Sequence, residues 1–280
     1  MQIFWSVSQK ERLRQLNADD QQLGMVFEDS AERNLAFQQL ENTLVQRERT
    51  FLDDYFTTKR RPRLVRLENR LAEALCEFGF VQVTTPIIMS KSHLARMTID
   101  ESHSLYNQVF WVSPNRCLRP MLAPHLYYLL RDLLRLREKP VRIFEIGLCF
   151  RKESQGPRHM SEFTMLNLVE MGLPEKECPR RLRQLASRIM QETGIETYKL
   201  VEEPSTVYGH TVDVVTGSDE IELGSGAAGP HPLDAAWGIT DAWVGIGFGL
   251  ERLLMADDQS GNLAKYGRSL AYLDGVRLNI

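Results

Sequence analysis

Apolar residues recur along the chain with two periods, one typical of helices and the other typical of strands. Phe37, Leu40 and Leu44 follow one another at spacings of three and four, which places them on one face of a helix. The same spacing predicts three further helices, over residues 62–78, 124–136 and 179–193. Alternation instead predicts two strands, over residues 142–150 and 162–169. The pattern therefore predicts a chain built of both helices and strands.

Capping signals predict two helices in the first part of the chain. The first opens with a capping box of Ser8 and Glu11, and the second, longer helix opens with the same kind of signal at Asp29. The basic stretch 57–62 then predicts a boundary after residues 1–56. Taken alone, these helices are either an appendage that packs against the fold or an arm that binds a polyanion.

Residues 80–85 predict a strand that ends at Pro86, and a proline in this place indicates a sheet edge or an interface. A dimer surface and a plain edge strand are the two interpretations. The remaining predictions before the centre of the chain are a short helix over 91–100, a polar loop over 103–107 and a hairpin over 109–112 and 117–121.

Residues 142–169 predict an antiparallel hairpin with a long loop. Arg151, Lys152 and Glu153 stand where the first strand leaves the apolar sheet. A guanidinium at a strand end can clamp a phosphate or a carboxylate, and a carboxylate beside it can accept from an adenine amino group. A solvated hairpin tip with an ordinary run of charges is the alternative that this stretch leaves open.

The last third of the chain is rich in predicted strands. Short strands are predicted over 206–208, 211–215 and 221–223. Glu222 and Ser225 offer the hard oxygen ligands that Mg²⁺ prefers, although a solvent-facing glutamate and a turn serine are the alternative. Residues 243–249 predict a strand with glycine at every second position, which favours a flat ring lying close against it, and Arg252 follows at the start of a helix.

Composition excludes whole classes of protein. With 25% charged and 43% hydrophobic residues, the chain is neither disordered nor a membrane protein, and its first residues do not resemble a signal peptide. We therefore expect a cytoplasmic protein without a membrane partner. The four cysteines lack the spacing of a zinc site, which indicates reduced, mostly buried thiols. The net charge of -3 means that a polyanion would have to meet local basic patches.

Three features stand in a definite order: a long helix and strand ending at Pro86, a hairpin carrying residues 150–153, and a glycine-rich strand leading into the helix of Arg252. Together they resemble the three signature motifs of class II aminoacyl-tRNA synthetases. Within that class, essentially the whole chain resembles the catalytic domain of the pyrrolysyl-tRNA synthetase family. The stretches that carry the resemblance are 118–124, 143–147, 150–154, 162–167, 207–209 and 247–252.

The resemblance implies an α+β fold, with an antiparallel β-sheet flanked by helices over residues 57–280 and a helical tRNA-binding extension over residues 1–56. It also implies a homodimeric ligase that uses ATP and Mg²⁺ to attach pyrrolysine to the amber-suppressor tRNA(Pyl) through a pyrrolysyl-adenylate. The start of the chain close to the catalytic domain resembles the bacterial form, in which a separate polypeptide supplies the N-terminal tRNA-binding module.

The resemblance further assigns site residues, with Arg151 and Arg252 as the catalytic pair. The residues implied for ATP are Arg151, Glu153, His159, Phe163, Glu222, Ser225 and Arg252, of which Glu222 and Ser225 would hold magnesium. The residues implied for the amino acid are Leu126, Tyr127, Leu130, Asn167, Val169, Tyr208, Trp243 and Gly245. Asn167 would hydrogen-bond the side-chain amide of pyrrolysine, Phe163 would stack on adenine, and Tyr208 would close over the ring as a lid.

The chain departs from the family pattern at a few positions. His125 replaces the usual asparagine, Val169 stands where cysteine is common, and one extra residue precedes Glu222. Two other functions stay open: a synthetase for another large or aromatic amino acid, and a non-catalytic regulator that binds tRNA. Intact Arg151 and Arg252 count against the regulator, which would not need a phosphate clamp.

Overall fold

The computed structural model of the chain describes residues 2–152, 160–217, 221–258 and 262–280. The chain divides into two compact units. The first consists of Met1–Arg63 together with Ser269–Ile280, and the second of Leu64–Arg268. The last residues of the chain therefore pack with the N-terminal helices, whereas the predicted division had placed them in the catalytic domain.

The first unit is mainly helical. Its elements are β1 (Ile3–Phe4), α1 (Val7–Gln15), α2 (Asp20–Leu23), β2 (Val26–Phe27), α3 (Ser30–Asp54), a π-helical turn over Tyr55–Lys59, β13 (Tyr272–Leu273) and β14 (Val276–Arg277). The cap predicted at Ser8 is wrong, because the Ser6 side chain accepts from the backbone N–H of Gln9 and Gln9 closes the box. The cap predicted at Asp29 is confirmed. The predicted linker at 57–62 is helical up to Lys59 and turns at Arg60, which has a φ of 55°.

The apolar side chains of the first unit form a small core of their own. Its buried members are Trp5, Leu13, Leu16, Phe27 and Leu44. The returning end of the chain is tied to these helices by polar contacts, because the Asn17 amide donates both to Glu48 (3.1 Å) and to the carbonyl of Gly275 (3.2 Å).

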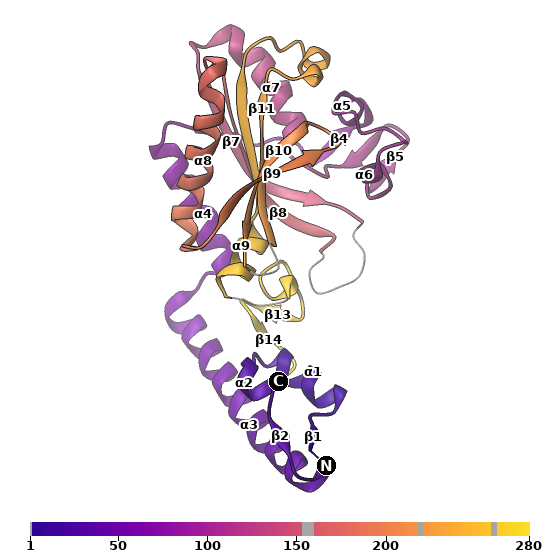
Figure 1. Cartoon of the computed structure of the whole chain (residues 1–280), viewed down its shortest axis with the longest axis vertical. Helices are drawn as coiled ribbons and strands as arrows, with labels where there is room; N and C mark the ends of the chain where they lie inside the picture. Colours follow the sequence, from indigo (N-terminus) through magenta and orange to yellow (C-terminus); the bar gives the residue numbers. More distant parts are fainter. Residues whose placement is uncertain (1, 153–159, 218–220, 259–261) are drawn as a thin grey trace. The chain divides into compact units, whose positions relative to one another are not determined.

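A seven-stranded sheet organises the second unit (Figure 1). Its strands, in spatial order, are β3 (Val81–Gln82), β7 (Val141–Phe150), β8 (Glu162–Met171), β12 (Trp243–Gly249), β11 (Ile221–Gly229), β10 (Gly209–Thr216) and β9 (Lys199–Ser205). All neighbouring strands are antiparallel except β3 and β7. The predicted central hairpin is confirmed as β7 and β8, and β3 is indeed an edge strand, although it is shorter than predicted.

Helices cover both faces of this sheet. Helices α4 (Arg63–Glu77), α8 (Cys178–Thr193) and α9 (Leu250–Asp257) share one core with the first face. Helix α7 (Ala123–Leu136) packs on β7 and β8 from the other face, and its core includes residues of a small sheet. That part contains β4 (Ile88–Ser90), α5 (Lys91–Arg96), α6 (Ser104–Asn107), β5 (Trp111–Ser113) and β6 (Arg116–Leu118). The predicted helices 62–78, 124–136 and 179–193 are confirmed, because their apolar faces are the buried ones.

Two local predictions were wrong because a side chain supplies a hydrogen bond that the pattern does not reveal. The predicted loop 103–107 contains α6, whose first turn is capped by the His103 ring accepting from the N–H of Leu105 (3.1 Å). The predicted strand 206–208 is a turn, because the Ser205 hydroxyl accepts from the N–H groups of Val207 and Tyr208. The strand expected to end at residue 223 instead continues as β11 to Gly229.

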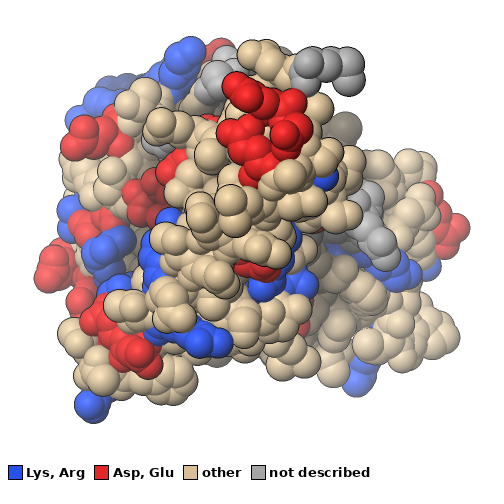
Figure 2. All heavy atoms as spheres, turned by 90° about the horizontal axis from the view of Figure 1, so that it is seen from below, with Lys and Arg blue, Asp and Glu red and all other residues tan. Residues whose placement is uncertain are grey.

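Surface charge and cysteines agree with an ordinary globular protein. On the face shown in Figure 2, lysine and arginine side chains are interspersed with aspartate and glutamate. All four cysteines are unpaired, and only Cys76 is exposed. Among the described residues, no helix combines the length and the apolar character needed to cross a membrane.

Candidate active site

The pocket face of the sheet is set by the alternation of side chains along its strands. Asn167 and Val169 of β8 point to the same face, since every second residue of a strand does so. Their direct neighbours across the ladder are Gly247 and Gly245 of β12. The predicted glycine pattern of β12 therefore opens space on this face, where a larger side chain would otherwise stand.

A pocket that is partly open to solvent lies on this face. Its lining residues are Ala123, Tyr127, Asn167, Val169, Tyr208, Thr211, Ser225, Gly226, Ala227, Trp243, Gly245, Ile246 and Gly247. Six of the eight residues predicted to contact an amino acid are among them. The other two, Leu126 and Leu130, are fully buried in the adjoining core and do not line the pocket.

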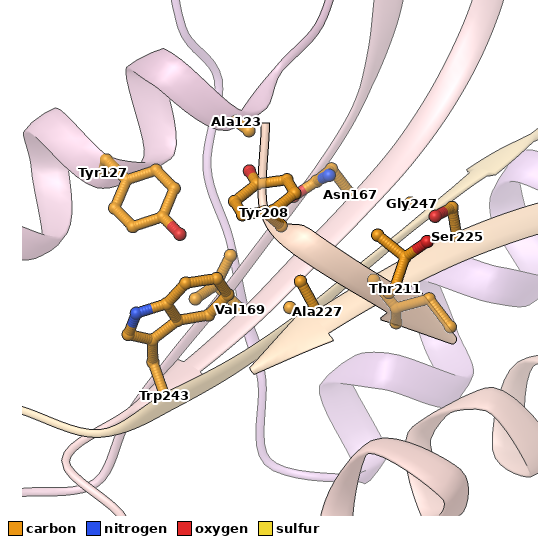
Figure 3. Close-up of a pocket in the computed structure, with 13 residues that line it drawn as sticks. Ala123, Tyr127, Asn167, Val169, Tyr208, Thr211, Ser225, Ala227, Trp243 and Gly247 are labelled. Atoms are coloured by element: carbon orange, nitrogen blue, oxygen red, sulfur yellow. The ribbon is translucent and has the colours of Figure 1, made fainter. Parts of the chain in front are cut away.

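The pocket has an aromatic end and a polar end (Figure 3). Tyr127 and Trp243 meet edge to face at the aromatic end, with ring centroids 5.3 Å apart, and Tyr208 meets Trp243 at 5.9 Å. Ser225 and Thr211 lie at the opposite end, and Asn167 and Tyr208 lie between the two. The arrangement suits a long ligand that is apolar at one end and polar at the other.

Asn167 can present its amide to a ligand because Gly247 leaves room for it. A Cβ at position 247 would lie 3.0 Å from the Asn167 Nδ2 atom, closer than side chains normally pack. In the part of the chain that the structure describes, the Asn167 amide has no hydrogen-bond partner. An amide beside a pocket and without a partner is suited to bind a polar group of a ligand.

Arg151 lies just beyond the end of β7. Its Nε atom donates to the carbonyl of Pro120 (2.9 Å), and its guanidinium stands over the Phe163 ring at 5.3 Å from the centroid. The backbone contact fixes the side chain near the face that carries Phe163 and Asn167. The predicted ATP residues Glu153 and His159 lie outside the described residues.

Helix α9 brings Arg252 to the polar end of the site. The helix is anchored by the buried carboxylate of Glu251, which accepts from the N–H of Thr164 at 2.9 and 3.0 Å. Burial raises the pKa of Glu251 to about 7. Arg252 then reaches back to β11, where its Nη1 atom donates to the carbonyl of Glu222 (3.3 Å) and lies 3.9 Å from the Glu222 carboxylate.

A β-bulge places Glu222 and Ser225 on one face of the sheet. Residues three apart in a regular strand point to opposite faces. Here Glu222 pairs with Val215 and Ser225 pairs with Asp213, so that the extra residue on β11 is Leu223. The Ser225 hydroxyl donates to Asp213 at 2.6 Å, which adds a carboxylate that the sequence did not predict.

These oxygen ligands fit a magnesium ion that is bound together with a nucleotide. No cluster of three acidic, histidine or cysteine ligands forms among the described residues. A nucleotide-bound Mg²⁺ needs only one or two carboxylates, because phosphates and waters complete its shell. Glu222, with Ser225 and Asp213 beside it on the same face, meets that requirement.

A buried polar network lies beside the pocket on β7. Glu145, the cross-strand neighbour of Asn167, pairs with Arg119 at 2.7 Å, and both side chains are almost fully buried. The Thr85 hydroxyl donates to Glu145 (2.7 Å), so its oxygen accepts from Arg119 (2.9 Å) and from the Nδ1–H of His125 (3.2 Å). The network thus requires a proton on Nδ1 of His125, so the neutral ring carries its single proton there.

This network predicts a specific loss of stability in acid. Burial, with the nearby His93 and Arg119, lowers the pKa of His125 to about 4. As the pH falls from about 6.5 to about 4, His125 becomes protonated in the unfolded chain but stays neutral in the folded chain. We expect the free energy of unfolding to fall by roughly 3 kcal/mol over this range from this group alone. Urea unfolding at pH 7, 5.5 and 4 measures it.

The control for that prediction is His125→Gln, which retains every other titrating group. The difference between the unfolding free energies of the two proteins should shrink as the pH falls from 7 to 4. A difference that is the same at all three pH values would show that His125 is not held neutral by the fold.

Comparison with known proteins identifies the fold and the family of the chain. Residues 50–266 match the family model of tRNA synthetases class II core domain (F). The crystal structure of a pyrrolysyl-tRNA synthetase from Desulfitobacterium hafniense matches with a TM-score of 0.93 and 54% identity over 99% of each chain. The chain belongs to the pyrrolysyl-tRNA synthetase family. A second D. hafniense structure, PylSc, a pyrrolysyl tRNA synthetase, has a TM-score of 0.90 and 52% identity over 99% of this chain and 96% of its own.

One departure from the pattern expected for a pyrrolysyl-tRNA synthetase has a structural explanation. His125 is part of the Thr85 network. Glycine at position 224 is required because a Cβ would lie 2.5 Å from the Phe248 ring. The predicted resemblance and the α+β fold class are confirmed.

Sequence reasoning missed several residues of this synthetase site. Asp213, Asp234 and the Arg119–Glu145 pair each depend on a hydrogen bond or ion pair between residues at least nine positions apart. Thr211 and Gly247 could have been found, because the first alternates with Asp213 and the second belongs to the glycine pattern of β12.

Proposed function

We propose that this chain activates pyrrolysine with ATP and transfers it to tRNA(Pyl). The single observation that carries the proposal is the pocket, whose aromatic end and Asn167 amide lie on the same sheet face as the arginine beyond the end of β7. Similarity to the D. hafniense pyrrolysyl-tRNA synthetase supports the choice of amino acid.

Activation requires no side-chain nucleophile. The amino acid carboxylate already carries the charge with which it attacks the α-phosphorus of ATP, and pyrophosphate leaves. Catalysis then consists of positioning and electrostatic stabilisation by Arg151 at the α-phosphate and Arg252 at the outer phosphates. Glu222 and Ser225 would hold Mg²⁺, which would add positive charge at the phosphates when bound. The ribose 3′ hydroxyl of the tRNA attacks the acyl-adenylate in the second step.

The pocket selects a long side chain that carries an amide. Apolar burial against Tyr127, Val169 and Trp243 supplies affinity, and Asn167 supplies the contact to the amide. In the proposed binding mode, Tyr208 closes over the substrate ring. The Tyr208 side chain already lies next to Trp243 in the structure.

Asn167→Ala should retain ATP binding and lose selectivity for pyrrolysine. Without Asn167 the substrate amide is left unpaired in a dry pocket, which costs about 1–3 kcal/mol and so lowers kcat/KM roughly 5- to 150-fold. Pyrophosphate exchange with pyrrolysine measures the loss. Thr211→Ala, which changes a residue at the far polar end of the pocket, is the control. Unchanged pyrrolysine kinetics in Asn167→Ala would refute the assignment of Asn167 as the residue that contacts the substrate amide.

Further properties belong to the same proposal. Residues 1–56 would bind tRNA, with or without a separate N-terminal module, and the enzyme would act as a cytoplasmic homodimer. The exposed Val81 on the edge strand β3 supports an interface on this side of the sheet.

The direct test measures pyrophosphate exchange across a panel of amino acids, followed by charging of purified tRNA(Pyl) with and without a separate N-terminal module. We expect exchange with pyrrolysine and charging of tRNA(Pyl). Exchange with phenylalanine or another aromatic amino acid instead would favour a synthetase of different specificity. No exchange with any amino acid would favour a regulator.

A further inference from the structure

Trp243 forms the aromatic end of the pocket, and its indole lies directly across the neighbouring strand. Gly229 of β11 is its cross-strand neighbour, and a Cβ at that position would lie 2.0 Å from the indole Nε1 atom. The ring therefore lies over Gly229, where no side chain stands, and its N–H group is the part of the ring nearest to that position.

Asp234 receives this N–H group. It lies in the 3₁₀-helix Pro232–Trp237, is only 4% exposed, and accepts from the Trp243 indole at 2.9 Å. The same oxygen, Oδ2, accepts from the backbone N–H of His231 at 2.8 Å. Asp234 therefore connects the wall of the pocket to a segment that does not itself line the pocket.

The rest of this aromatic wall has little polar anchoring. Within the described residues, the Tyr127 hydroxyl of this wall is buried without a hydrogen-bond partner, as is the second oxygen of Asp234 itself. Ring contacts of 5.3 to 5.9 Å hold Trp243 against Tyr127 and Tyr208 but do not fix rotation as a directional hydrogen bond does. Burial raises the pKa of Asp234, a cost that its two donors on Oδ2 partly offset.

We propose that Asp234 is a positioning residue for the amino acid substrate, because it fixes the Trp243 indole across Gly229 and thereby sets the depth of the pocket. The proposal rests on the proposed function only in the identity of the substrate. Asp234 acts through Trp243, at the end of the pocket opposite Ser225, so its influence falls on amino acid binding and not on the phosphate end (Figure 3).

The test is a double-mutant cycle with Asp234→Ala, Trp243→Phe and the double variant, assayed by pyrophosphate exchange with pyrrolysine. Each single variant should raise the KM for pyrrolysine roughly ten-fold, while the KM for ATP stays within about two-fold. The double variant should be no worse than Trp243→Phe alone, because Phe has no N–H for Asp234 to hold. Asp234→Asn, which retains an acceptor oxygen, should restore the KM to within about three-fold of the wild type.

Two outcomes would overturn the proposal. Additive effects in the double variant would show that Asp234 does not act through Trp243. A lower melting temperature for Asp234→Ala with an unchanged KM would show a merely structural role. Asp234→Ser, too short to reach the indole but still polar, replaces the alanine variant if that variant does not fold.

Failure of the proposed function would be visible separately. If the wild type activates a different amino acid, the same cycle is run with that amino acid. If it activates none, the exchange rate of the Trp243 indole proton, identified by its loss in Trp243→Phe, is compared between the wild type and Asp234→Asn or Asp234→Ser. Faster exchange in the serine variant alone supports the contact, and equal rates in all three proteins refute it.

Discussion

The Arg151→Ala variant is expected to lose at least about a thousand-fold in the rate of pyrrolysine-dependent pyrophosphate exchange. Negative charge develops on the α-phosphate during the reaction. The mechanism uses no general base, so catalysis depends on stabilising this charge. Arg151 lies beyond the end of β7, with its Nε atom held by the Pro120 carbonyl and its guanidinium over the Phe163 ring. Without this preorganised cation, the developing charge is stabilised only by water molecules, which must reorient during the reaction.

Two variants distinguish the contribution of the planar Arg151 guanidinium, with its several N–H donors, from the contribution of its positive charge. Arg151→Lys retains the charge but loses the planar guanidinium, so its rate should fall between those of the wild type and Arg151→Ala. Lys152→Ala removes the neighbouring cation, which stands over Phe110 instead, and should exchange at close to the wild-type rate. Normal pyrophosphate exchange in Arg151→Ala would refute the catalytic assignment.

The sequence was sufficient to predict the elements whose periodicity is unbroken. Helices α4, α7 and α8 each bury a stripe at spacings of three and four, and β7 and β8 alternate over part of their length before consecutive buried residues begin. Helix starts were less certain where two signals compete. Ser6 with Gln9 and Ser8 with Glu11 both have the residue spacing of a capping box, and the helix begins after Ser6.

Candidate site residues could be predicted where they belong to a recognisable sequence motif. They could not be predicted where their placement depends on the pairing register of two strands. Arg151, Asn167 and Arg252 followed from the resemblance. The joint placement of Glu222 and Ser225 depends on a bulge at Leu223, which no local pattern announces. Asp234 and Glu145 escaped notice because an isolated acidic residue in a sequence is usually exposed, and only the fold brings Trp243 and Arg119 to them.

Both of these buried acidic residues lie next to a residue that would contact the substrate. Glu145 is the cross-strand neighbour of Asn167, and Asp234 holds Trp243. Asp234 therefore holds a pocket residue directly, whereas Glu145 lies beside Asn167 and bonds Arg119 and Thr85 instead. A buried carboxylate of either kind is stable only while its own partner is present.

Glu145→Ala is accordingly expected to be the most destabilising of the variants considered, by about 3–5 kcal/mol. It leaves the Arg119 guanidinium buried without its counter-charge and removes the acceptor of both the Thr85 N–H and the Thr85 hydroxyl. For a unit of this size the melting midpoint should fall by roughly 6–20 °C in a calorimetric or circular dichroism scan. Asp132→Ala, which breaks exposed pairs with Arg131 and Arg135, is the control and should shift the midpoint little. Equal shifts in the two variants would mean that the buried pair contributes no more than a surface one.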